Sequence, residues 1–521
     1  MIRKLSAVLL LSSLGAHSLS AQAKLSVDKV YSAYLRSSGA ITDKDQIKGY
    51  YYLYQSDKID RKTNEYTLQI LDENLNKGKD IKFEDTKRLS LLESSFNGNT
   101  LAFLFKNGED RTLEMKIYDL DGKLKYTYTR PYTKKTDALM NQYETLHTDE
   151  GMNQNVFEVG TKGFVSVMPL RDGRDVTYEV DVYSSDKKKM WTYKPEDDKE
   201  RFAQAEFLMA TDSLIFLEVT KKNRKMSGSG TAHLVCINHE TKKKVFDLDD
   251  ENDDVTFVPA SILPVKGNGK FIVMGSYFDK DANILKDFSK GLAIYELDAN
   301  GKVLNKTYNS WTKEIAHYLP TNNKGKIDKI GFLYVHKLIQ TADGKIFVVG
   351  EGYKRQADAA GIALTALSVM SRSARSAGVT KIVVTDLVMM EFDKDFKLKG
   401  ASIHEKRDNT AIGGEMADYA SQHALAMFIK MQGYFDYEFT TGNPDENNFV
   451  VCYSDWEKTA NYKGKTFNSI RYNGTKFSKD KIELKSKASR MQVLPAKSGS
   501  VMIMEYFKKD KRLDFRIEKL G

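Results

Sequence analysis

The chain has 521 residues, a formal net charge of +9 and only two cysteines. This length allows two or three ordinary domains or one large repeat domain, and two cysteines exclude a fold held together by several disulfides. No segment reaches ~18 uninterrupted apolar residues, so the sequence predicts no transmembrane helix.

Residues 1–23 have the three parts of a secretory signal peptide. Arg3 and Lys4 supply positive charge, Leu5–Leu14 is a short apolar segment, and Ala21-Gln22-Ala23 is a cleavage site of small residues. No cysteine lies nearby to carry a lipid, so we expect an exported protein, periplasmic or secreted, that is not a lipoprotein. We expect cleavage after Ala23, with cleavage before Gln22 as the alternative. Either position lowers the net charge from +9 to +7, because it removes Arg3 and Lys4.

The rest of the chain repeats one pattern eight times. A short apolar run is followed by a second, alternating strand, and most second strands end in a tight turn such as Asp121-Gly122 or Asn473-Gly474, as β-hairpins do. The apolar runs are Gly49–Gln55, Leu101–Phe105, Gly163–Met168, Ser213–Val219, Lys270–Gly275, Lys345–Gly350, Asn448–Tyr453 and Val501–Phe507. Such periodicity predicts a radial or solenoid β architecture, because one unit cannot bury its own hydrophobic face.

Each unit gains a strand before its apolar run, as in Val258–Gly269, and another after the turn, as in Lys302–Tyr308. Four antiparallel strands, termed A to D with the apolar run as B, match the blade of a β-propeller. The last unit ends after its C strand, and Lys24–Leu35 is a strand without a unit. We expect residues 24–35 to close the ring and hide both sheet edges. The prediction is one all-β domain over residues 24–521, a propeller of eight blades, with seven as the alternative.

These repeats resemble those of β-propellers in general, and the chain is similar to exported propeller proteins of unknown function from Gram-negative bacteria. The resemblance covers nearly all of the mature chain. No regular Trp-Asp pair marks WD40 blades, and Trp191, Trp311 and Trp456 do not follow the turns regularly, as they would in quinone-enzyme propellers. The resemblance implies the fold and no particular activity.

The longest connections all leave one face of this predicted ring. In a four-stranded meander the B–C and D–A loops share a face, here called the B–C/D–A face. One insertion, 355–380, contains the apolar stretch Ala359–Met370 followed by Ser371–Gly378, rich in Ser and Arg. The other, 408–432, places apolar residues at helical spacing, namely Met416, Tyr419, Ala420, His423, Ala424, Met427 and Met431. We expect one or two helical insertions, either packed on the scaffold or docking a partner or membrane surface.

Basic residues gather in the loops of the same face. The candidate ligand- or partner-binding residues are Arg355, Arg372, Arg375, Lys221, Lys222, Arg224 and Lys225. Their charge favours a protein or an anionic polymer as partner, with an ordinary solvated surface as the alternative. No recognition motif supports nucleic acid.

Signals for metals and disulfides are weak. One segment has a partial calcium-loop spacing, with Asp279, Asp281, Asn283 and Asp287 as candidate ligands, but Ile284 and Lys290 occupy the positions of the turn glycine and the bidentate glutamate. We therefore expect no cofactor, calcium being the one candidate. Cys236 and Cys452 lie in predicted strands of distant units, so we expect two buried free thiols.

No G-x-S-x-G, H-E-x-x-H, P-loop or Gly-rich dinucleotide motif occurs. Glu351, Asp386 and Glu391 lie near the long loops, with no spacing that pairs them as acid and base. We favour a non-enzymatic exported propeller that binds a macromolecular or anionic partner through the B–C/D–A face. The alternatives are a glycan- or lipid-active hydrolase or lyase on the same scaffold, which carboxylates or histidines clustered in the central cavity would favour, and a structural envelope component.

Overall fold

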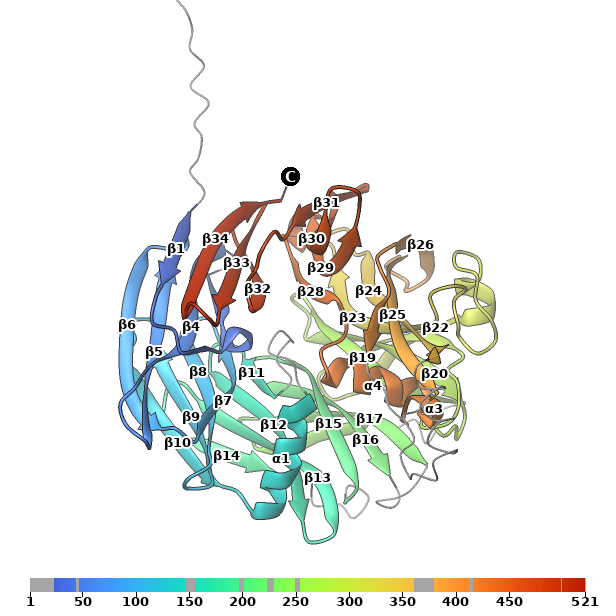
Figure 1. The fold of residues 1–521 in the computed structure, drawn as a ribbon. Helices are drawn as coiled ribbons and strands as arrows, with labels where there is room; N and C mark the ends of the chain where they lie inside the picture. Colours follow the sequence, from blue (N-terminus) through green and yellow to red (C-terminus); the bar gives the residue numbers. More distant parts are fainter. Residues whose placement is uncertain are drawn as a thin grey trace, which may run out of the picture.

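The computed structural model describes residues 23–43, 46–146, 155–195, 201–222, 229–248, 254–359, 379–411, 416–497 and 499–520. Their strands form eight antiparallel sheets arranged as a ring (Figure 1). This confirms the predicted eight-bladed β-propeller and makes the seven-bladed alternative wrong. Within the described ranges, no helix is both long and apolar enough to cross a membrane.

The blades are given in the order A, B, C, D. Blade one has β2 (Ser32–Ala33) and β3 (Gly39–Asp43) as an interrupted A strand, then β4 (Gln46–Lys58), β5 (Thr63–Asp72) and β6 (Lys77–Thr86). Blade two is β7 (Leu89–Phe96), β8 (Thr100–Asn107), β9 (Thr112–Asp119) and β10 (Leu124–Pro131). Blade three is β11 (Val156–Val159), β12 (Gly163–Asp172), β13 (Asp175–Ser184) and β14 (Met190–Tyr193). Blade four is β15 (Ala203–Ala210), β16 (Leu214–Lys222), β17 (Gly230–Asn238) and β18 (Lys243–Leu248).

Blade five is β19 (Val255–Val265), β20 (Lys270–Asp279), β21 (Gly291–Leu297) and β22 (Val303–Ser310). Blade six is β23 (Phe332–Gln340), β24 (Ile346–Ala357), β25 (Thr380–Phe392) and β26 (Leu398–His404), with β27 (Asn409–Ala411) also paired to β25. Blade seven is β28 (Tyr437–Thr441), β29 (Phe449–Lys458), β30 (Lys463–Tyr472) and β31 (Phe477–Glu483). Blade eight is β32 (Arg490–Pro495), β33 (Ser500–Phe507), β34 (Arg512–Lys519) and β1 (Lys24–Val27).

The hydrophobic core lies between neighbouring blades. Val165 and Val180 of blade three, for example, belong to one buried cluster with Ile215 and Leu217 of blade four. Since each B strand is covered on both of its faces by neighbouring sheets, its sequence is a nearly continuous run of apolar residues. All eight predicted runs are B strands.

The N-terminal strand completes the last sheet. β1 pairs antiparallel with β34, with Leu25 opposite Phe515 and Val27 opposite Leu513, and Figure 1 shows the two strands side by side. The paired segment is shorter than the expected 24–35. The Tyr31 N–H donates to the Gln55 carbonyl, and Ser32–Ala33 then pair with β4 of blade one.

The long connections leave the B–C/D–A face. They hold α1 (Lys134–Leu146), the π-helical turn η3 (Trp311–Ile315), α3 (Met416–Tyr419) and α4 (Gln422–Met431). The 3₁₀ turns η1 (Leu35–Ser37) and η4 (Pro444–Glu446) are shorter. Helix α1 is not anticipated from the sequence, because its residues are mostly polar; Thr136 and Met140 are the buried ones among the side chains that the structure describes in this helix.

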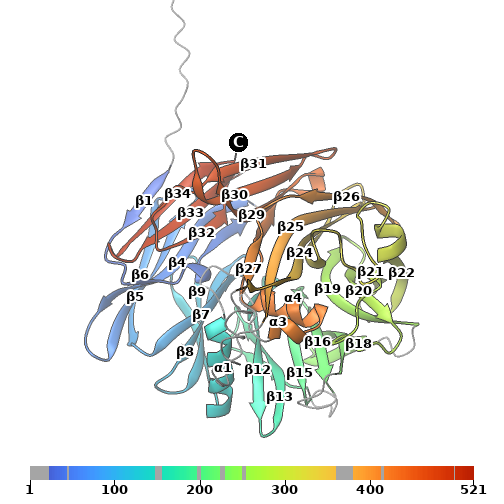
Figure 2. The same cartoon turned by 45° about the vertical axis from the view of Figure 1, so that its right-hand side comes forward.

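Helix α4 packs on blade six near the middle of the ring (Figure 2). Leu425, Ala426 and Ile429 are buried against strands β24 and β25. The expected apolar stripe is therefore only partly correct: Tyr419 is 87% exposed, and the buried face lies beside the predicted one. His423 and Met427 instead line small cavities next to the helix.

Candidate ligand-binding groove

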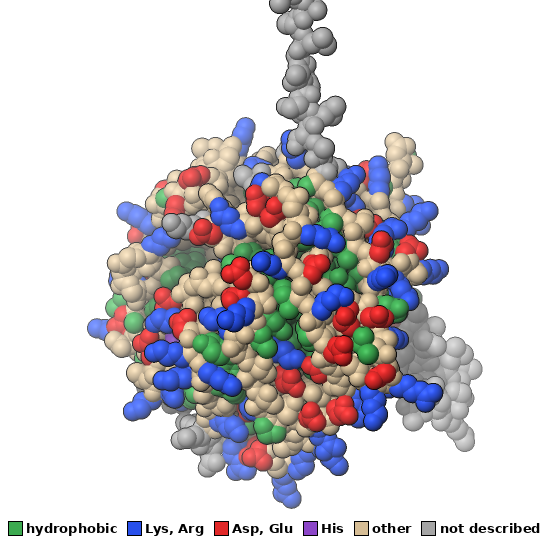
Figure 3. Space-filling view, turned by 90° about the vertical axis from the view of Figure 1, so that its left-hand side faces the viewer, with side chains coloured by type: hydrophobic (Ala, Val, Ile, Leu, Met, Phe, Trp, Pro, Cys, Tyr) green, Lys and Arg blue, Asp and Glu red, His purple; other side chains and the backbone are tan. Residues whose placement is uncertain are grey.

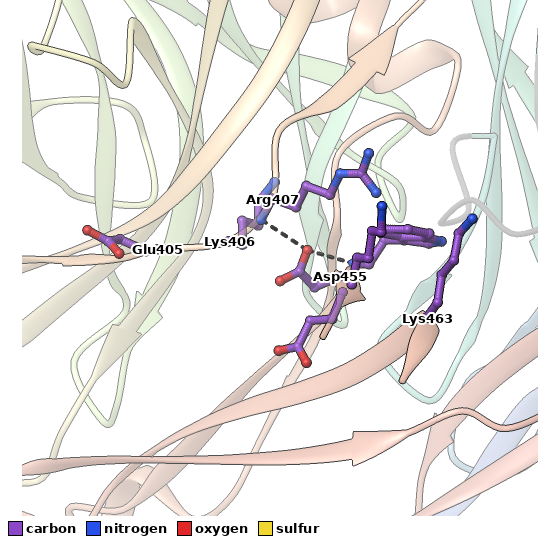
Figure 4. Close-up of a pocket in the computed structure, with 8 residues that line it drawn as sticks. Glu405, Lys406, Arg407, Asp455 and Lys463 are labelled. Atoms are coloured by element: carbon purple, nitrogen blue, oxygen red, sulfur yellow. Dashed lines mark hydrogen bonds between the residues drawn. The ribbon is translucent and has the colours of Figure 1, made fainter. Parts of the chain in front are cut away.

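A groove of about 660 Å³ lies between blades six and seven on the B–C/D–A face (Figure 4). One wall is the turn from β26 to β27, which contributes Arg407. The other wall is the paired ends of β29 and β30, which contribute Trp456, Lys458 and Lys463. The groove is thus built by segments that only the ring brings together.

The two walls are joined through Asp455. Its Oδ1 accepts hydrogen bonds from the backbone N–H of Arg407 at 3.1 Å and from that of Trp456 at 2.6 Å. The Arg407 guanidinium carbon lies 4.0 Å from the centroid of the Trp456 ring, a cation–π contact. Burial raises the pKa of Asp455, although these backbone donors oppose the shift.

The exposed charges of the groove are mainly positive. Lys458 and Lys463 lie directly opposite each other in the hairpin, an arrangement of like charges that is unfavourable without a counter-ion. Among the described residues, neither lysine nor Arg407 forms an ion pair. Of the acids, Glu457 pairs with Lys481 at 2.7 Å, and Glu405 points away from the other residues in Figure 4.

This charge pattern differs from the outer surface near blades one and two. On the side of the ring at the left of Figure 1, Lys and Arg side chains alternate with Asp and Glu (Figure 3). Interspersed signs are typical of an ordinary solvated surface. The overall positive charge therefore indicates nothing specific there, whereas the groove concentrates cations around an aromatic ring.

Lys406, the neighbour of Arg407, points into the protein and anchors the turn. Its side chain has no exposed surface, and its Nζ lies 3.0 Å from Glu351 Oε1 and also contacts Asp436. Glu351 is equally buried, accepts from the Asp436 N–H at 3.1 Å and lies 3.1 Å from His336 Nε2. We call these four residues the Lys406 network.

Electrostatics in the network fix which groups carry charge. Burial raises the pKa of Asp436 to about 7, and the charge of Glu351 adds to this shift. Burial works in the same sense on Glu351, but Lys406 and His336 hold the pKa of Glu351 below its usual value. Burial lowers the pKa of His336, so its ring is neutral at neutral pH. The ionised pair Lys406–Glu351 therefore holds the turn and leaves Arg407 facing the groove.

A second polar cluster lies where α4 meets blade four. Glu206 and Glu218 are opposite each other in β15 and β16, and Lys430 Nζ lies 2.5 Å from Glu206. His423 Nε2 lies 3.3 Å from Thr220 Oγ1. Burial, with the charge of Glu206, raises the pKa of Glu218 to about 8, so this carboxyl is protonated at neutral pH. The adjoining cavities measure only about 170 and 70 Å³, below the ~300–1,000 Å³ of typical ligand pockets.

The structure separates the basic residues predicted to bind a partner. Lys221 is buried and pairs with Asp247 at 2.7 Å, while the Lys222 N–H donates to the Phe202 carbonyl. Arg355 is a strand residue, because β24 continues to Ala357 and Arg355 pairs with Ile382. Its guanidinium contacts the Ala420 carbonyl, so the expected loop 355–380 begins later than predicted. The remaining candidates, Arg224, Lys225, Arg372 and Arg375, lie outside the described residues.

The calcium candidates serve the local loop. Asp279 pairs with Lys290 at 2.8 Å, Asp287 Oδ2 accepts the Asn283 N–H at 2.7 Å, and Asp281 has a positive φ of 57°. Across the described ranges, no three His, Cys, Asp or Glu side chains are grouped to hold a metal. Cys236 and Cys452 are buried and unbridged, as expected.

The groove is not among the sites predicted from the sequence. Trp456 beside two lysines of a predicted hairpin is a usable signal for a surface site, because large aromatic residues there are rarely needed for packing alone. Its partner wall cannot be found in this way, since Arg407 and Asp455 are 48 residues apart. Only the arrangement of blades six and seven places them together.

Comparisons with known proteins give a family and distant structural likenesses. No curated protein matches the chain. The β-propeller domain of the Trilobed protease from Pyrococcus furiosus is 10% identical, with 73% of this chain and 97% of that chain covered and a TM-score of 0.31. The WD40 domain of SCAP from fission yeast is 8% identical, with 92% and 94% covered and a TM-score of 0.36. Prolyl oligopeptidase B from Galerina marginata is 10% identical, with 84% and 46% covered and a TM-score of 0.32.

Structural similarities with TM-scores this low do not indicate an activity for this chain. The family comparison is more extensive, because it matches every residue from 1 to 521. The chain belongs to the family of unknown function DUF6770.

Proposed function

We propose that the protein is an exported binding propeller whose groove between blades six and seven takes an acidic polysaccharide. The main observation that supports this proposal is a set of exposed cations around the half-buried Trp456, namely Arg407, Lys458 and Lys463. Guanidinium and ammonium groups bind carboxylates by charge-assisted hydrogen bonds, and an indole offers an apolar surface to the C–H groups of a sugar ring. A uronate-containing chain combines both features.

The expected location of the protein is based on its N-terminal sequence. Residues 1–23 carry the pattern of a secretory signal peptide, which supports a periplasmic or secreted protein. Acidic polysaccharides occur in the cell envelope and outside it, so export would bring the groove to such a ligand.

Binding is favoured over catalysis by the shape of the two sites. The groove is open and has room for a polymer. Two of its three carboxylates are engaged, because Asp455 accepts two backbone N–H groups and Glu457 pairs with Lys481, and the third, Glu405, points away from the other lining residues (Figure 4). Glu206 and Glu218 resemble an acid–base pair, because their environments differ. The cavities beside them, about 170 and 70 Å³, are too small for a sugar chain.

Calorimetry with oligogalacturonate tests the proposal, with a neutral galactan oligomer of equal length as ligand control. An exposed ion pair contributes up to ~1 kcal/mol, so the double variant Lys458→Gln/Lys463→Gln should weaken binding about tenfold. The matched variant Lys476→Gln/Lys479→Gln removes two exposed lysines near the opposite end of the same blade and should bind normally. Equal binding of the neutral oligomer, or equal weakening in both variants, would contradict the proposal.

A further inference from the structure

A cavity of about 170 Å³ lies between blade three, blade four and α4. Its walls are β11, the second half of β12, the start of β13, the start of β15 and the C-terminal half of α4. B strands end, and A and C strands begin, on the B–C/D–A face. The cavity, here called the α4 cavity, therefore lies at that face, whereas the groove lies between blades six and seven.

The body of the cavity is apolar and adaptable. The rings of Phe157 and Phe207 stack with centroids 4.0 Å apart and planes 9° from parallel. Met168, Met427 and Met431 complete much of the wall, and thioether side chains adjust their shape to a ligand. An apolar cavity of ~150 Å³ in another protein accepts benzene, so this volume suits a molecule of one ring.

The wall of the cavity also carries an ion pair. Glu206 and Lys430 lie 2.5 Å apart there, with side chains 21% and 25% exposed. A carboxylate has about four lone-pair sites, so Glu206 has capacity for another donor while it keeps Lys430. A charged ligand would have to compete with this ion pair, and breaking one partner from a partly buried pair is costly. A neutral donor leaves the pair intact.

We propose that the α4 cavity binds a small uncharged molecule, with a single apolar ring packed on Phe157 and Phe207 and a hydroxyl group that donates to Glu206. Phenols are the chemical class that fits. This site is independent of the groove and does not rest on polysaccharide binding.

Phenol, benzene and benzoate are the probes that test the assignment on the full chain. Methyl signals of ¹³C-labelled methionine report the wall, because Met168, Met427 and Met431 belong to it. Phenol should shift these signals and bind at least fivefold more tightly than benzene, while benzoate should not bind. Absence of a shift at millimolar phenol, or equal affinity for phenol and benzene, would overturn the proposal.

Two variants separate the contribution of the apolar wall from that of the ion pair. Ala205→Ile adds three carbons to the wall and should weaken phenol at least tenfold, whereas Ala401→Ile, on β26 and outside this cavity, should not. The double variant Glu206→Met/Lys430→Met avoids leaving one charge unpaired and should bind phenol and benzene equally. Unchanged phenol affinity in Ala205→Ile refutes the location, and a surviving preference for phenol in the double variant refutes the role of Glu206.

Discussion

Replacing Lys406 by methionine should strongly destabilise the protein, although the lysine lies next to a surface turn. Its side chain has no exposed surface, and neither has that of Glu351, which it neutralises at 3.0 Å. Methionine keeps most of the length of the side chain but removes the ammonium group, with its charge and its N–H donors. The variant therefore leaves Glu351 buried without a cation.

Removing one partner of a buried ion pair costs about 3–5 kcal/mol, a large share of the 5–15 kcal/mol that stabilises a typical domain. The backbone N–H of Asp436 and the His336 ring remain near Glu351, so the lower part of that range is expected. The double variant Lys406→Met/Glu351→Gln should recover most of the loss, because no ionised carboxylate then remains at the position of Glu351.

Urea denaturation at pH 7 measures these differences, with Lys458→Met as the control. Lys458 is exposed, so its replacement should change stability by less than about 0.5 kcal/mol. The Lys406→Met protein should also gain stability between pH 7 and pH 5, because Glu351 can then be protonated. A single variant as stable as the wild type, or a double variant no better than the single one, would refute the role assigned to the Lys406 network.

Three further predictions concern the ring, the second polar cluster and the thiols. A chain starting at Tyr31 loses the buried Val27 and Val30, worth ~1.5–3 kcal/mol each, and should unfold at lower urea than one starting at Ala23; equal midpoints would exclude a closing role for β1. Because burial and Glu206 raise the pKa of Glu218 from 4.5 to about 8, its contribution to stability is full below about pH 4.5 and is lost as pH rises to about 8, by up to ~1.4 kcal/mol per pH unit. Glu218→Gln should remove that slope in urea titrations from pH 5 to pH 9, and an identical slope would contradict the assignment. Burial raises the pKa of Cys236 to about 12 and also raises that of Cys452, so thiol reagents should modify both only after unfolding; rapid labelling of the folded chain would argue against their burial.

The blades could be predicted because a strand that is buried on both faces has apolar residues at nearly every position, and such runs are visible in the sequence. Leu101–Phe105 is fully buried in β8, and in a repeat an unbroken apolar run of that length indicates a strand covered on both faces. The closing strand was harder, because Lys24–Val27 and Ser32–Ala33 lie on one continuous stretch but pair with different blades. The short link between them, residues 28–31, has no glycine or proline to indicate a turn that divides the stretch.

The sites could not be predicted, because their partners come from distant segments. From the sequence, Lys221 is predicted to be a cation in an exposed loop. In the structure, strand β18 places Asp247, 26 residues away in the chain, beside it. Arg355 is predicted to lie in a loop because it follows the end of the apolar run. The pairing of β24 with β25 extends beyond that run and makes Arg355 a strand residue. Arg407 has an unremarkable local sequence, and only its stacking on Trp456 gives it a role.

Fluorine NMR of the chain labelled with 5-fluorotryptophan would test the central claim, that the groove binds an acidic polysaccharide, most directly. The sequence has three tryptophans, of which only Trp456 lines the groove, and each signal can be assigned by a Trp→Phe variant. On titration with oligogalacturonate, the Trp456 signal should move and saturate at the affinity found by calorimetry, while those of Trp191 and Trp311 stay in place. A Trp456 signal that does not move while calorimetry reports binding would contradict the account.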